Sequence, residues 1–266
     1  MKRNAYAKIN LDLHITGKRP DGYHTLETTM QSVSLCDTVF YRKSSSPFAF
    51  SCSDRSLEND KNLCVRAAKA FFDAAGIMPC GKLRLKKRVP YGAGLGGGSS
   101  DGAAVLRLLN DAFEKPLPEE RLLLLASSLG ADVAFCLRGG KALCRGIGDE
   151  MTFLSDDLPL LLVIAKGKDG LSTPEMYRRY DEKHASGQED TERPENDFQP
   201  VAEEALPEIA ALCDLMRAQG AKEARMTGSG SAVFGVYENA ENAKSTAKAL
   251  KKRGFFAKVC ATVPRY

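Results

Sequence analysis

The sequence predicts an α+β protein of two domains. Near the middle of the chain, a strand with alternating basic and apolar residues leads through a glycine-rich run into an apolar helix. After about residue 154, strands and helices alternate in a pattern typical of a sheet with helices on one face. A length of 266 residues allows one large domain or two of ordinary size, and we expect two, over residues 1–154 and 155–266.

The composition narrows the classes of function. The formal net charge is +4, but the basic residues form no tail and are not interleaved with aromatic residues, so we expect no nucleic-acid partner. Eight cysteines are spread without a C-x-x-C pair or a histidine at metal-ligand spacing, which indicates reduced core thiols. No apolar run reaches the roughly 18 residues of a membrane span, and the N-terminus lacks a signal segment, so we expect a cytoplasmic protein without a membrane partner.

The N-terminal segment over residues 5–16 has the period of a strand. Apolar and polar residues alternate, which places Lys8 and Asn10 on the same polar face. Residues 17–22 have the glycine and proline content of a turn, and they lead into a second strand over residues 25–36.

A helix is expected from Leu63 to about Ala75, with Gly76 as its end. The next strand, residues 82–89, alternates basic and apolar residues as a half-exposed strand does. It leads directly into the glycine-rich run.

The glycine-rich run predicts an anion-binding loop. It has five glycines over residues 92–98, where a backbone without side chains can adopt positive φ and present N–H groups to a ligand. Ser99, Ser100 and Asp101 are residue types favoured at a helix N-cap, and we expect the helix over residues 103–110. The dipole of that helix favours phosphate.

Two common phosphate-binding motifs, the P-loop and the dinucleotide-binding pattern, fit this run poorly. A P-loop requires Lys and then Ser or Thr after its last glycine, but two serines follow Gly98. A dinucleotide-binding pattern matches at Gly92, Gly94 and Gly97, but the alternating strand before it is unlike the buried parallel strand of that fold. A flexible linker is the other alternative, and the patterned strand and apolar helix on its two sides argue against it.

The rest of the chain predicts further helices and strands. Glu119 and Glu120 suit the first turn of a helix that ends at Gly130. Asp132 then stands as a single acid at the head of an apolar segment. Beyond it we expect a strand over 158–165, a helix opening at 173–180, a charged loop over 181–196, a helix over 200–219, a turn at 227–231 between two strands, a helix over 240–252 and a strand over 255–263.

Three motifs resemble those of the GHMP kinase family, named for galactokinase, homoserine kinase, mevalonate kinase and phosphomevalonate kinase. They are Ala-Lys-Ile-Asn-Leu at residues 7–11, the glycine-rich run at residues 90–101, and Met-Thr-Gly-Ser-Gly-Ser-Ala-Val-Phe at residues 226–234. The resemblance covers nearly the whole chain. It implies an N-terminal ATP-binding domain like domain 2 of ribosomal protein S5, a C-terminal ferredoxin-like α/β sandwich, and ATP with Mg²⁺ as the phosphoryl donor.

Two further segments, residues 17–26 and 130–133, are similar to particular members of that family. Those members phosphorylate the 2-hydroxyl of a cytidyl diphosphate derivative of methylerythritol, on a route to isoprenoid precursors. The resemblance therefore implies two small-molecule partners, this cytidyl diphosphate substrate and ATP. It makes no prediction about oligomeric state.

The resemblance also assigns catalytic roles. Asp132 would be the general base, since a carboxylate that takes the proton of a hydroxyl typically contributes ~10²- to 10⁴-fold to the rate. Lys8 would stabilise the alkoxide and the moving phosphoryl charge, and Asn10 on the same face would hydrogen-bond the substrate. Without the resemblance, a capping Asp and a solvated strand Lys would be the better interpretations.

For the cytidine end, the resemblance points to His24 as a hydrogen-bonding partner of the base and to Tyr23 as a residue lining its pocket. Tyr177 is the positional candidate for an aromatic ring that closes the other face of the cytosine, a stacking contact worth ~1–3 kcal/mol. A turn histidine and a core tyrosine are the alternatives.

The nucleotide is expected along the glycine-rich run, with backbone N–H groups on its phosphates and a hydroxyl of Ser99 or Ser100 near Mg²⁺. By position, Asn62 and Lys87 would contact the adenine end, although a helix-start Asn and an exposed strand Lys are equally good interpretations. The turn at residues 227–231 would approach the site from the second domain. The candidates for nucleotide binding are Asn62, Lys87, Pro90, Tyr91, Gly92, Ala93, Gly94, Leu95, Gly96, Gly97, Gly98, Ser99 and Ser100.

Two other functions stay open from the sequence. One is a GHMP kinase that acts on homoserine or a mevalonate derivative. The other is a nucleotide-binding module without catalysis, against which the presence of both Lys8 and Asp132 argues.

Overall fold

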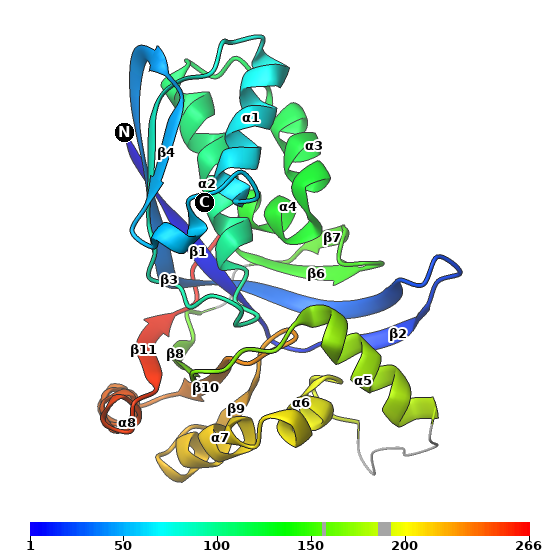
Figure 1. Ribbon diagram of the computed structural model, residues 1–266. Coiled ribbons are helices and arrows are strands. Elements are labelled where there is room, and N and C mark those ends of the chain that lie inside the picture. Colours follow the sequence, from blue (N-terminus) through cyan, green and yellow to red (C-terminus); the bar gives the residue numbers. More distant parts are fainter. Residues whose placement is uncertain (156–157, 186–192) are drawn as a thin grey trace.

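A computed structural model describes residues 1–155, 158–185 and 193–266 of the chain. It contains two β-sheets, each with helices on one side (Figure 1). The seven-stranded sheet draws its strands from residues 2–153, and the four-stranded sheet draws its strands from residues 161–261. Among the described residues, no helix is both long and apolar enough to cross a membrane.

The first sheet is built around the long strand β3 (His24–Pro47). β3 pairs antiparallel with four others: β1 (Lys2–Asn10), β2 (His14–Lys18), β5 (Cys80–Lys86) and β6 (Lys141–Arg145). Two short strands complete the sheet: β4 (Ala49–Cys52) pairs parallel with β5, and β7 (Glu150–Phe153) pairs with β6.

The single strand expected over residues 5–16 is wrong, because the chain forms β1 and β2 with a break between them. At the break, the Leu11 N–H donates to the Thr29 carbonyl at 2.8 Å, and Leu13 forms an isolated bridge with Asn196 of the second domain. The alternation of polar and apolar residues continues through the break, so the pattern alone does not reveal it.

Four helices cover one face of the first sheet: α1 (Leu63–Ala75), α2 (Gly97–Ala112), α3 (Glu119–Leu129) and α4 (Ala131–Arg138). The bounds of α1 are those expected, with the Asn62 side chain capping its start and Gly76 ending it at a φ of 65°. The expected N-cap among residues 99–101 is wrong. α2 begins at Gly97 because Gly96, in the left-handed region, already turns the chain into the helix.

The second sheet has the strand order β11 (Phe256–Ala261), β8 (Leu161–Lys166), β10 (Val233–Tyr237), β9 (Glu223–Met226), and all its pairs are antiparallel. Helices α5 (Thr173–Ala185), α6 (Gln199–Ala205) and α7 (Glu208–Ala218) lie between β8 and β9, and α8 (Ala240–Lys252) precedes β11. This β-α-β-β-α-β connection is that of the expected ferredoxin-like sandwich.

Two expectations for the second domain are corrected. The helix over residues 200–219 is two helices, since Pro207 has no N–H to donate within a continuous helix. The charged loop over residues 181–196 is in part helical, because α5 extends to Ala185. Asn196 is buried, and its amide donates to the carbonyls of Met226 and Gly228; the remainder of that loop, residues 186–192, lies outside the described residues.

The two sheets are held together by an apolar cluster. Ala7, Ile9 and Val33 from the first sheet pack in it against Ile164 and Phe234 from the second. The chain then returns to the first domain after β11, with isolated bridges between Val33 and Thr262 and between Gly139 and Arg265. Because segments cross in both directions, the expected boundary after residue 154 stays a prediction.

The core beneath α1 gives a test of the first domain. The Phe72 side chain is fully buried and contacts the rings of Phe48, Phe71 and Phe113 at centroid distances of 5.8–5.9 Å. We expect Phe72→Ala to lower the free energy of unfolding by about 3–5 kcal/mol, as measured by urea denaturation. Met78→Ala, at a side chain that is 83% exposed, is the control and should change it by less than about 0.5 kcal/mol.

Candidate active site

Two glycine loops, one from each domain, meet at the centre of the molecule. The Ala232 N–H donates to the Ala93 carbonyl at 3.2 Å. A side chain on Gly94 would place its Cβ 2.3 Å from the Thr227 carbonyl oxygen. The loops therefore approach this closely only because Gly94 has no side chain, and residues 227–231 reach the site as expected.

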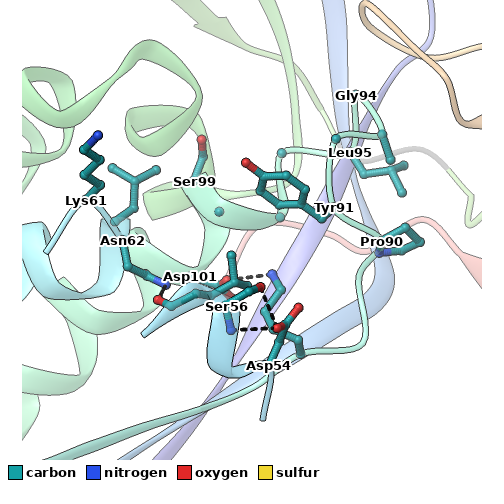
Figure 2. Close-up of a pocket in the computed structure, with 18 of the residues that line it drawn as sticks. Asp54, Ser56, Lys61, Asn62, Pro90, Tyr91, Gly94, Leu95, Ser99 and Asp101 are labelled. Atoms are coloured by element: carbon teal, nitrogen blue, oxygen red, sulfur yellow. Dashed lines mark hydrogen bonds and ion pairs between the residues drawn. The ribbon is translucent and has the colours of Figure 1, made fainter. Parts of the chain in front are cut away.

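A cavity of about 680 Å³ lies along the glycine-rich run. Its other wall is the segment that leads into α1, so Lys61 and Asn62 lie on one side and Pro90 and Gly94 on the other (Figure 2). This volume is within the usual range for a small-molecule site. The lining includes all the expected nucleotide-binding residues except Ser100, and it adds Asp54, Ser56, Leu57, Asn59, Lys61, Leu63 and Asp101.

The first turn of α2 supplies the donors of this cavity. The Ser100 N–H makes the first bond of the helix, to the Gly96 carbonyl at 2.8 Å, so the N–H groups of Gly97, Gly98 and Ser99 precede the helical ladder. The Ser100 hydroxyl is buried and donates to the Gly97 carbonyl at 2.9 Å, whereas Ser99 lines the cavity. Of the two serines, only Ser99 therefore presents its hydroxyl to a ligand.

The glycine-rich run and the first turn of α2 together form the cradle expected for phosphate. A buried ionic triad lies beneath this cradle. The Lys87 ammonium donates to Asp37 at 2.6 Å and to Asp101 at 2.8 Å. Asp37 also accepts the backbone N–H groups of Arg88 and Val89. Burial raises the pKa of Asp101 to about 8, with Lys87 opposing the shift and Asp37 adding to it. Burial thus favours the protonated form of Asp101.

The two residues expected at the adenine end also have structural roles. Lys87 belongs to the triad, and the Asn62 side chain accepts from the Cys64 N–H and donates to the Leu57 carbonyl. Both line the large cavity, so their contact with adenine stays a prediction.

A second cavity of about 210 Å³ adjoins the first, and the two share Gly92, Gly94 and Gly96 in their walls. Lys8 and Asp132 meet here, with 3.6 Å between Nζ and Oδ2. The Lys8 side chain is only 6% exposed, whereas that of Asp132 is 35% exposed. The site therefore offers an accessible carboxylate beside a buried, fixed ammonium, at the place where the phosphate cradle ends.

Local structure explains why these two side chains meet. Lys8 lies near the end of β1, and its N–H donates to the Leu95 carbonyl at 3.0 Å. A Cβ on Gly96 would lie 2.9 Å from Lys8 Cγ, so the lysine passes under the loop only at a glycine. Asp132 is in the first turn of α4, where the helix dipole favours a carboxylate.

Of the three residues expected at the cytidine end, two lie together and the third lies apart from them. The His24 ring is buried and stacks on Tyr177 at 4.5 Å, and its Nε2 lies 2.7 Å from Asp181 Oδ1. Tyr177 lines the smaller cavity. Tyr23, in contrast, is 64% exposed at the turn before β3 and is not part of the lining of either cavity. The Tyr23 N–H donates to the Asp21 side chain within this turn at 3.2 Å.

Several residues of the site are not evident from the sequence. Asp181 holds both His24 and Lys18, and hydrogen bonds from these groups lower its pKa although burial opposes the shift. Asp37 and Thr28 lie on β3, far in sequence from their partners. Alternation along a strand marks the faces of such residues, but their partners are set by the pairing of distant strands.

Known proteins with similar sequences support one family. Residues 62–140 match the GHMP kinases N terminal domain, and residues 183–255 match the GHMP kinases C terminal domain. The chain is 40% identical to the 4-diphosphocytidyl-2-C-methyl-D-erythritol kinase of Desulfitobacterium hafniense (strain Y51), with 98% of this chain and 95% of the relative covered. The chain belongs to the GHMP kinase family. The kinase of the same name from Chlorobium luteolum is 42% identical, with 91% and 90% covered.

Solved structures agree with this assignment. A crystal structure of 4-(cytidine 5'-diphospho)-2C-methyl-D-erythritol kinase is 35% identical in sequence and has a TM-score of 0.83. The match covers 98% of this chain and 99% of the chain in that structure. The mevalonate kinase of Methanococcus jannaschii has a TM-score of 0.72 at 16% identity, and the match covers 99% of this chain and 98% of that kinase chain. This second likeness shows the GHMP kinase fold alone.

The contact between the glycine loops gives a matched pair of variants. Gly94 has a φ of 70° and no room for a Cβ, whereas Gly98 is helical and its Cβ would meet nothing closer than 3.7 Å. We expect Gly94→Ala to lower the free energy of unfolding by more than the ~1–2 kcal/mol cost of the left-handed backbone. Gly98→Ala should leave it unchanged or raise it. Equal effects in urea denaturation would contradict the close contact.

The triad predicts a pH dependence. An unfolded Asp has a pKa of about 3.9, and native Asp101 has a pKa of about 8. Between these values the native state binds the extra proton, so stability falls as the pH rises. We expect Asp101→Asn, which does not titrate, to lose less stability than the wild type between about pH 5 and about pH 8.

The control for this measurement is Asp54→Asn. Hydrogen bonds from Ser56 lower the pKa of this exposed carboxyl, so it does not titrate in the same window. Parallel stability curves for the wild type and Asp101→Asn would contradict the protonated state of Asp101.

Proposed function

We propose that this protein transfers the γ-phosphoryl group of ATP to the 2-hydroxyl of 4-diphosphocytidyl-2-C-methyl-D-erythritol. The observation that carries the proposal is the Lys8–Asp132 pair, which lies where the phosphate cradle meets the smaller cavity. Phosphoryl transfer requires positioning and charge stabilisation more than covalent chemistry. The identity of about 40% to kinases of this substrate supports the choice of acceptor.

Asp132 and Lys8 would act on the acceptor hydroxyl together. The exposed Asp132 carboxylate accepts the hydroxyl proton as the oxygen attacks the γ-phosphorus. The Lys8 ammonium, held at 2.7 Å from Asn10 Oδ1, stabilises the negative charge that develops on that oxygen. The Asn10 carbonyl oxygen keeps a second lone pair with which it can accept a hydrogen bond from the substrate.

ATP would occupy the larger cavity. The N–H groups of Gly97, Gly98 and Ser99 and the positive end of the α2 dipole suit its phosphates. Mg²⁺ usually takes few ligands from the protein and the rest from phosphates and water. The site fits this coordination, since Ser99 offers one hydroxyl oxygen to the cavity. Bound there, Mg²⁺ would neutralise charge on the phosphates.

The cytidyl group would bind beyond the smaller cavity, near His24 and Tyr177. Tyr177 already stacks on His24, so a cytosine ring requires the other face of Tyr177 or a displaced His24. Tyr23 would have to turn inward from its exposed position to line the pocket. A cytoplasmic location and the absence of a nucleic-acid partner remain predictions from the sequence.

The direct test is ADP release with Mg-ATP and the cytidyl substrate, run beside the same diol without its cytidyl group. We expect turnover of the cytidyl substrate alone, and a fall in kcat of ~10²- to 10⁴-fold in Asp132→Asn because the proton acceptor is lost. Asp73→Asn, an exposed acid on α1, is the matched control and should keep full activity. Turnover of neither compound by a folded, ATP-binding protein would refute the proposed substrate.

A further inference from the structure

A chain of hydrogen bonds runs along the wall of the smaller cavity from Lys8 to the backbone of Asp12. The Lys8 ammonium donates to Asn10 Oδ1 at 2.7 Å, and Asn10 Nδ2 donates to Thr28 Oγ1 at 2.7 Å. The Thr28 hydroxyl in turn donates to the Asp12 carbonyl at 2.5 Å. The Asn10 backbone is fixed separately, since its N–H donates to Thr227 Oγ1 at 2.8 Å.

The direction of these bonds follows from the protons available. A threonine hydroxyl has one proton, and the Asp12 carbonyl, which can only accept, takes it. Thr28 Oγ1 can therefore only accept from Asn10, so the NH₂ group of Asn10 must face Thr28. The carbonyl oxygen of the same amide then faces Lys8, which is the orientation that an ammonium requires.

We propose that Thr28 is a positioning residue, which sets the orientation of the Asn10 amide and through it the place of the Lys8 ammonium. Thr28 is fully buried and Asn10 is 3% exposed, and both lie in the wall of the smaller cavity. Without the Thr28 hydroxyl, the Asn10 NH₂ group would lose its acceptor, and the Lys8 ammonium would be the one remaining partner, among the described residues, that holds the side-chain amide in the native orientation. The Asn10 carbonyl oxygen would then be less firmly fixed, and the Lys8 ammonium would shift with it.

This inference rests on the proposed function, and Thr28→Val tests it because valine keeps the shape and removes the hydroxyl. We expect kcat for the cytidyl substrate to fall roughly ten- to a hundredfold, since a displacement of about 1 Å at a reacting centre can cost ~10²-fold. KM for ATP should be unchanged, because the glycine cradle is intact. Thr28→Ser keeps the hydroxyl and should restore kcat.

Thr29→Val is the matched control. Thr29 is the next residue of β3 and points to the opposite face of the sheet. The same chemical change there should leave kcat at the wild-type value. A comparable loss in Thr29→Val would mean that any threonine lost from this strand is harmful, and would refute a specific role of Thr28.

A double-mutant cycle with Asn10→Ala separates positioning from general damage. If Thr28 acts through Asn10, then Thr28→Val should cause no further loss of kcat in the Asn10→Ala background. Additive losses would refute the inference, and so would a kcat of Thr28→Val equal to that of the wild type. A wild-type protein that turns over neither substrate would instead refute the proposed function, so the two failures are distinguishable.

Discussion

The architecture depends on a place where three pieces of backbone come within van der Waals distance of one another. The glycine-rich run passes over Lys8 of β1 on one side and against the 227–231 loop of the second domain on the other. Gly94 and Gly96 make both approaches possible because neither has a Cβ, and both adopt positive φ. The same conformation that lets the domains touch also turns the chain into α2 and directs its N–H groups toward the large cavity.

Around this contact, buried polar groups are numerous and nearly all have partners. Lys8, Asn10 and Thr28 form one network, and Lys87 forms another with Asp37 and Asp101 beneath the cradle. Buried charges without partners cost several kcal/mol, so such networks fix single positions for their members. The protein thereby places rigid charges at the site, and its exposed groups, such as Asp132, are the ones left to meet the substrate.

Much of this could be predicted from the sequence, and the limits have physical causes. The bounds of α1 and α8 follow from local sequence, with asparagine caps at their starts. The alternation of polar and apolar residues along β1 places Lys8 and Asn10 on one strand face, where they form a hydrogen bond. The start of α2 differs from the predicted one because the left-handed Gly96 turns the chain into the helix before the capping residue types at positions 99–101. Asp37, Thr28 and Asp181 depend on which distant strands and helices lie together, and a local pattern contains no information about that.

The return of the chain to the first domain affects the order in which the protein can be completed during synthesis. Residues 262–266 pair with Val33 and Gly139, and the Tyr266 ring packs near that of Tyr6. A ribosome makes these residues only after both sheets have been translated. While nascent, the N-terminal domain thus lacks part of its surface, and the active site between the domains can assemble only once the second domain has emerged.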